Sequence, residues 1–152
     1  MGKYFSIDEM IKSTTASAKN IDNTPNDEQK KHIIELIDVL DMLREGWTEL
    51  CEENKWGTAS IRVNSGFRCD ELNKAVGGSK TSSHKTGYAA DIEPVNNRMK
   101  EFQEFVPNFC KEHNIAFDQI IKEKPKNGVA SWLHFGLFNG KGEQREQVFW
   151  LN

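Results

Sequence analysis

Residues 82–91 read SSHKTGYAAD, and the rest of the chain is best understood around this stretch. It contains a histidine, His84, and an aspartate, Asp91, with a glycine between them. A second histidine, His134, follows in residues 131–137, which read SWLHFGL. Two imidazoles and one carboxylate are ligands that hold a catalytic zinc ion and leave a fourth position open for water. The three side chains are therefore a candidate zinc site.

Each of these residues also has an ordinary interpretation. A lone histidine in a strand is more often a structural or surface residue than a metal ligand. Asp91 could cap a turn or pair with Lys85, and His84 could lie on the surface of a loop. The prediction of a metal site depends on the three residues occurring together.

Strand alternation gives a test of whether the ligands can meet. In an expected strand over residues 131–138, Leu133, Phe135 and Leu137 share the face that should be buried, and His134 lies on the other. In an expected strand over residues 89–94, the positions on either side of Asp91 belong to the face that should be buried. The side chain of Asp91 therefore points to the opposite face. Both side chains can therefore project from the uncovered side of one sheet. Gly136 would leave space there, and Trp132 would form a wall.

The bulk composition indicates an ordinary globular protein. The chain has 152 residues, of which 37% are hydrophobic and 28% charged, so it fits one domain over residues 1–152. The net charge of −3 gives no electrostatic reason to expect nucleic acid or an acidic membrane surface as a partner. The cysteines show no CxxC spacing and are expected to be free thiols. Nothing in the sequence requires more than a monomer.

The helical signals precede most of the strand signals. A short helix should follow the N-cap Ser6, and residues 14–23 should form a loop. The longest helix should begin at Thr24-Pro25 and end near residues 54–57, where Gly57 supplies the stop. A short helix is expected over residues 70–76. Another is expected over residues 97–114, with a kink or break at Pro107.

The remaining segments alternate as strands do. They cover residues 59–64, 89–94, 117–123, 131–138 and 147–151, with a turn at residues 124–130. Helices combined with short strands and tight connections predict an α+β fold, in which helices cover one face of a small, mostly antiparallel sheet.

The chain shows no signal peptide and no stretch long enough to cross a membrane. We therefore expect synthesis in the cytoplasm without membrane insertion.

The motifs together resemble those of a known family. The pattern SxHxxGxAxD at residues 82–91, SGFR at residues 65–68 and WxH at residues 132–134 is similar to the zinc D-Ala-D-Ala carboxypeptidases of family M15. These enzymes cut bacterial cell-wall peptides, and hedgehog domains share their fold. FSIDEM at residues 5–10 and NIDNTP at residues 20–25 resemble the small phage and prophage members. The resemblance runs from about Phe5 to Phe138.

The resemblance implies roles for individual residues. His84, Asp91 and His134 would bind Zn²⁺. Arg68 would contact the substrate or polarise its scissile carbonyl, although it could instead be a surface arginine paired with Asp70 or Glu71. Ser82 would orient the loop or hydrogen-bond near the metal, or simply form a turn. Ser82 and Trp132 are the expected substrate-binding residues.

The general base departs from the pattern of several family branches. Those branches place a glutamate three residues before the second histidine, where this chain has Ser131. In the phage-type relatives an acid follows an Asp-Gln strand, as in FDQIIKE at residues 117–123. Glu123 is therefore the first candidate for the base and Asp118 the second. The alternative is that Glu123 is a solvated acid at a strand end.

These assignments predict a zinc metallopeptidase that hydrolyses peptide bonds in peptidoglycan, either as a carboxypeptidase or as an endopeptidase. A compact domain without a signal peptide fits a phage or prophage endolysin that reaches the cell wall after release. The alternatives on the same fold are a non-catalytic, zinc-containing wall-binding module and a structural component of the virion.

Overall fold

The computed structural model describes residues 2–123 and 132–151, without the side chains of Glu123, Trp150 and Leu151. The predicted turn at residues 124–130 and Ser131 lie outside the described residues.

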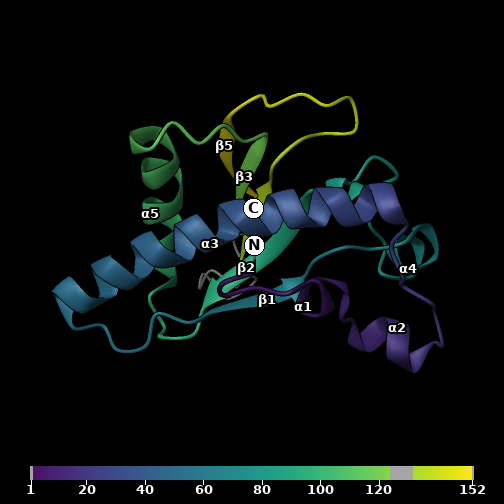
Figure 1. Ribbon diagram of the computed structural model, residues 1–152, viewed down its shortest axis with the longest axis horizontal. Coiled ribbons are helices and arrows are strands. Elements are labelled where there is room, and N and C mark those ends of the chain that lie inside the picture. Colours follow the sequence, from purple (N-terminus) through teal and green to yellow (C-terminus); the bar gives the residue numbers. More distant parts are fainter. Residues whose placement is uncertain (1, 124–131, 152) are drawn as a thin grey trace.

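The longest helix, α3 (Asp27–Asn54), crosses the whole molecule (Figure 1). It begins later than predicted, because Asn26 rather than Thr24 is the N-cap. Asn26 and Gln29 form a reciprocal capping box, whereas the Thr24 hydroxyl is bonded to Asp22. The helix ends within the predicted range, at Asn54, although Lys55 rather than Gly57 adopts the left-handed conformation that ends it.

The other helices are shorter. Ser6 caps the first of them as predicted. The second, capped by Ser13, lies where a loop was expected. The predicted break at Pro107 does not occur, because α5 continues through it and holds Phe102, Val106 and Cys110 in the core. These helices are α1 (Ile7–Ile11), α2 (Thr14–Ala18), α4 (Asp70–Ala75) and α5 (Met99–Glu112), with a 3₁₀ turn, η1 (Ser83–Thr86).

The strands form one five-stranded sheet of order β1-β2-β4-β3-β5. All neighbouring pairs are antiparallel except β3 and β5, which are parallel. The α+β prediction is thus confirmed, with one parallel pair in the sheet. The strands are β1 (Ile61–Ser65), β2 (Ala89–Pro94), β3 (Gln119–Glu123), β4 (Leu133–Gly136) and β5 (Gln147–Leu151).

The core lies between the sheet and the helices α3 and α5. The predicted apolar stripe of α3 is buried, and Trp47 packs edge-on against Phe102 of α5 with ring centroids 5.1 Å apart. Ile92, Ile120 and Phe135 contribute the inner face of the sheet. Because successive strand residues point to opposite faces, this burial leaves Asp91 and His134 on the outer face. None of the helices in the described ranges is long and apolar enough to span a membrane.

Candidate metal centre

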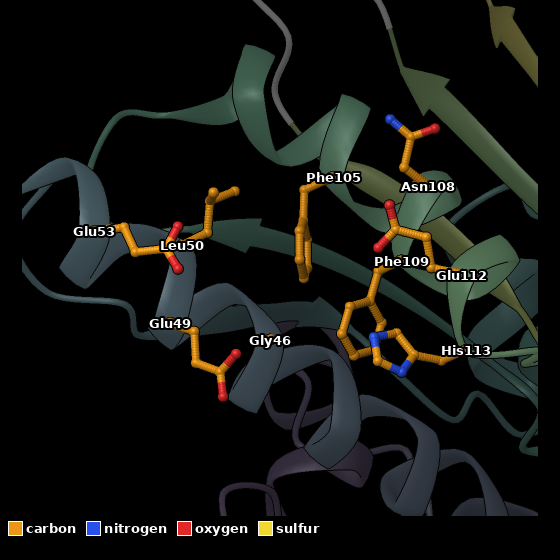
Figure 2. A pocket seen from close by; sticks show the side chains of 9 residues that line it. All are labelled: Gly46, Glu49, Leu50, Glu53, Phe105, Asn108, Phe109, Glu112 and His113. Atoms are coloured by element: carbon orange, nitrogen blue, oxygen red, sulfur yellow. The ribbon is translucent and has the colours of Figure 1, made fainter.

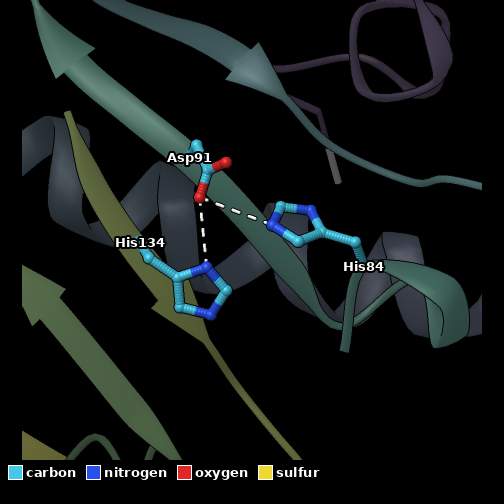
Figure 3. Close-up of side chains that lie close together, drawn as sticks. All are labelled: His84, Asp91 and His134. Carbon is cyan, nitrogen blue, oxygen red and sulfur yellow. Dashed lines mark hydrogen bonds and ion pairs between the residues drawn. The ribbon is translucent and has the colours of Figure 1, made fainter. Parts of the chain in front are cut away.

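His84, Asp91 and His134 converge on one point (Figure 3). The Oδ1 atom of Asp91 lies 3.4 Å from Nε2 of His84 and 3.1 Å from Nδ1 of His134. One ligand atom of each residue lies within 4.8 Å of the other two. Ligands about 2.0–2.2 Å from a zinc ion are themselves roughly 3–4 Å apart. The group is therefore compact enough to hold one metal ion.

Strand register brings Asp91 and His134 together. The two residues are direct partners in the antiparallel pair β2–β4, so their side chains share one face of the sheet. Their neighbours Ile92 and Leu133 are fully buried on the other face. The prediction that both ligands project from the uncovered side is confirmed.

His84 comes from η1 and is almost entirely buried, with 3% of its side chain exposed. Its Nδ1 atom lies 2.7 Å from the carbonyl oxygen of Gly66. A carbonyl can only accept, so Nδ1 carries the proton and Nε2 keeps its lone pair toward Asp91. The Ser82 hydroxyl accepts a hydrogen bond from the backbone N–H of His84 at 3.2 Å. Ser82 therefore caps η1, and its contact with metal or substrate stays a prediction.

The electrostatics of the group favour the protonation states that bind a metal. Burial raises the pKa of Asp91, but its interactions with His134 and His84 outweigh this effect and hold the pKa below its ordinary value. Burial lowers the pKa of His84, although Asp91 opposes this shift. An ionised carboxylate and a neutral imidazole are the forms that ligate metal ions.

Arg68 lies beside the group with 14% of its side chain exposed. Its Nε atom donates to the Ser65 hydroxyl at 3.2 Å, and Nη1 donates to Oδ1 of Asn73 at 3.0 Å. Nη2 is 3.9 Å from Oδ2 of Asp91. The alternative pairing with Asp70 is not observed, because Asp70 is bonded to Lys85.

A groove of ≈ 740 Å³ opens from this point, within the range of about 300–1,000 Å³ found for ligand pockets. Arg68, Asp91 and Trp132 line its metal end, so the predicted wall position of Trp132 is confirmed. From there it follows β1, which is an edge strand, toward α1 and residues 12–15.

A family model for peptidase M15 matches residues 3–119. The chain belongs to the M15 peptidase family. The match includes His84 and Asp91 but ends before His134, which β4 brings to the group. The curated proteins give no match to the chain. M15 peptidases depend on a metal, and the only cluster of metal-ligand type among the described residues is this one.

The two candidates for the general base of this M15 peptidase differ in what the structure shows. Glu123 ends β3, two positions after Ile121, the direct partner of His134. The side chain of Glu123 lies outside the described part. Glu123 stays a prediction.

Asp118 is engaged elsewhere. Its carboxylate is buried and accepts from Nε of Arg145 at 2.8 Å and from Nη2 at 2.9 Å, besides the backbone N–H of Arg145. With both oxygens bonded, Asp118 has a clear structural role in joining β3 to the segment before β5. Asp118 also interacts electrostatically with His134, and its function as a base stays a prediction.

This ion pair predicts a pH-dependent stability. Burial raises the pKa of Asp118, but the bonds from Arg145 outweigh it and lower the pKa. The stabilisation is therefore present above the unfolded pKa of about 3.9 and is lost as the pH falls through the lower folded value. We expect Arg145→Met to reduce the free energy of unfolding at pH 7, because it leaves the buried Asp118 carboxylate without its partner. Urea denaturation of both proteins checks this. A cost that persists undiminished at pH 3 would contradict it.

A second hollow lies between α3 and α5 and contains none of the three ligand residues (Figure 2). Phe105 and Phe109 form its floor, and Glu49, Glu53 and Glu112 surround it.

Sequence inspection missed the partners that fix the site. These are the carbonyl of Gly66 and the amides of Asn23 and Asn73. Asn23 donates to the carbonyls of Ile11 and Phe67 and accepts from the N–H of Cys69, tying the N-terminal segment to the SGFR loop. Such amides have no motif of their own, because only the tertiary fold reveals which backbone groups they meet.

Proposed function

We propose that this M15 peptidase is a zinc enzyme that hydrolyses peptide bonds in bacterial peptidoglycan. The observation that supports this most directly is the convergence of two imidazole nitrogens and one carboxylate oxygen at the end of a peptide-sized groove. Three protein ligands with an open fourth position are typical of catalytic rather than structural zinc.

The residues present fit such an ion. Gly66 fixes the tautomer of His84, and a ligand histidine whose second nitrogen donates to a carbonyl is the usual arrangement around protein-bound metals. Zinc held by the three residues would lower the pKa of a bound water toward neutrality and polarise the scissile carbonyl. Glu123 is our candidate to take the proton of that water as general base.

Arg68 has a separate role in this proposal. Its guanidinium lies at the metal end of the groove, and its Nη2 atom has no hydrogen-bond partner within the described part of the chain. Nη2 would donate to the oxygen on which negative charge develops when the peptide carbonyl is attacked.

We expect Arg68→Ala to lower kcat by about 10²–10³-fold while the bound metal is retained, because one donor to an oxyanion contributes about this much. Peptide hydrolysis and zinc content are measured on the same preparation. Arg98→Ala is the control, since Arg98 is half exposed and pairs with Glu101 away from the groove. Equal activity of Arg68→Ala and the parent would remove Arg68 from the mechanism.

We propose further that the whole chain, residues 1–152, acts as a monomeric catalytic domain, and that it is a phage or prophage endolysin that acts at the cell wall. The support is the likeness of its N-terminal motifs to the small phage-type members of the family. A wall-binding or virion module without catalysis is the competing function.

The test is a digest of purified cell walls from several hosts, with the released peptides identified by mass spectrometry. We expect cleavage at one defined bond, lost on chelation and restored by zinc. The identity of the new termini separates carboxypeptidase from endopeptidase activity. Zinc-loaded protein that binds the walls and releases no peptide would establish the non-catalytic module instead.

A further inference from the structure

Asn73 is a buried polar residue in the short helix α4, with 4% of its surface exposed. Asparagine is a poor helix former, and burying its amide is unfavourable unless its polar atoms are bonded. Its side chain is fully engaged. Oδ1 accepts from Nη1 of Arg68 at 3.0 Å, and Nδ2 donates to the carbonyl of Ser79 at 2.9 Å.

These two bonds connect different parts of the site. Ser79 begins the loop that leads to His84, while Arg68 donates through its backbone N–H to the carbonyl of His84 at 3.0 Å. The packing around the amide is close. A Cβ atom at Gly78 would lie 2.1 Å from Oδ1 of Asn73 and 2.6 Å from Nη1 of Arg68.

The guanidinium of Arg68 is thereby held from one side by neutral acceptors. The Ser65 hydroxyl accepts a hydrogen bond from Nε, and Oδ1 of Asn73 accepts one from Nη1. Nη2 is therefore the nitrogen that faces Asp91 and the groove. A carboxylate at position 73 would form an ion pair with the Arg68 guanidinium and offset its charge. The neutral amide of Asn73 orients the guanidinium and leaves its positive charge to interact with another group.

We propose that Asn73 is a positioning residue that holds the Arg68 guanidinium with Nη2 directed at the reacting carbonyl. This inference rests on the proposed function of the site. Asn73 does not touch the substrate, and its effect on the reaction is exerted through Arg68.

A double-mutant cycle tests the proposal. Asn73→Leu keeps the branched skeleton of the side chain and removes both bonds, and we expect it to lower kcat/KM at least about tenfold in the parent. In an Arg68→Met background the same change should alter kcat/KM less than about twofold, because the group it positions is gone. Asn73→Asp keeps the acceptor and should retain Arg68 in place, so it should be less impaired than Asn73→Leu.

A second measurement does not depend on turnover. In ¹⁵N spectra of arginine side chains, the signal of the Arg68 Nη1 proton donated to Asn73 is assigned by its loss in Arg68→Met. We expect slow solvent exchange of this proton in the parent and in Asn73→Asp, and fast exchange in Asn73→Leu. If the parent hydrolyses no peptide, the proposed function fails while this exchange result still decides whether Asn73 orients Arg68.

If Asn73→Leu lowered kcat/KM by the same factor in the parent and in Arg68→Met, Asn73 would have only a structural role and the proposal would be overturned. Unchanged exchange of the Arg68 proton in Asn73→Leu would overturn it as well. Circular dichroism and zinc content of each variant establish that folded, metal-loaded proteins are compared.

Discussion

His134→Ala should bind zinc more than about 100-fold more weakly than the parent and should lose peptide hydrolysis with it. Changes to groups that only support metal ligands already cost about 10–100-fold in affinity, and loss of a ligand should exceed this. His134 is the best of the three for this test, because 15% of its side chain is exposed whereas His84 is buried. Replacing it should therefore disturb the fold least.

The measurement is a competition between protein and a chromogenic chelator for zinc, paired with peptide hydrolysis. His113→Ala is the matched control, since His113 is exposed and packs with a tilted ring against Phe109 beside the second hollow. We expect this control to bind zinc as the parent does. Tight zinc binding by His134→Ala would show that the metal is held elsewhere.

Gly66→Ala should weaken both the fold and the metal site. A Cβ atom at residue 66 would lie 2.2 Å from the carbonyl oxygen of Met10 and 3.0 Å from its carbon. These are backbone atoms and cannot move aside as a side chain could. Residue 66 must shift instead, and its carbonyl is the acceptor that fixes the tautomer of His84.

For Gly66→Ala we expect a loss of about 1–3 kcal/mol in the free energy of unfolding, as for other overpacked sites. Zinc affinity should fall about 10–100-fold. Thermal unfolding with and without zinc measures the first effect, and chelator competition measures the second. Gly140→Ala serves as control, because a Cβ atom there would meet nothing within 4 Å. Unchanged affinity in Gly66→Ala would mean that this carbonyl does not support the ligand.

Local patterns in the sequence were sufficient to predict much of the fold. The stripe of α3 and the alternation in β2 and β4 identify buried faces directly, because burial imposes the helix and strand periods. The same alternation predicted that Asp91 and His134 share a face. Errors concentrated at element ends, as at Asn26 and Lys55, where competing caps differ little in free energy.

Contacts between distant segments could not be predicted in this way. The parallel pairing of β3 with β5 follows from how the chain returns to the sheet, and no local pattern encodes it. The same holds for the carbonyl of Gly66 beside His84 and for Asn73 beside Arg68. The pairing of Asp118 with Arg145 is a further contact of this kind, because the motif around Asp118 does not encode it.

The most direct test of the metal centre is a titration of metal-free protein with Co²⁺, followed by visible absorption and checked by zinc content. We predict one equivalent bound, with the intense d–d bands of a four-coordinate site, displaced by zinc and absent from His134→Ala. Co²⁺ that binds with the weak spectrum of an octahedral surface site, or equally in His134→Ala, would contradict a centre formed by His84, Asp91 and His134.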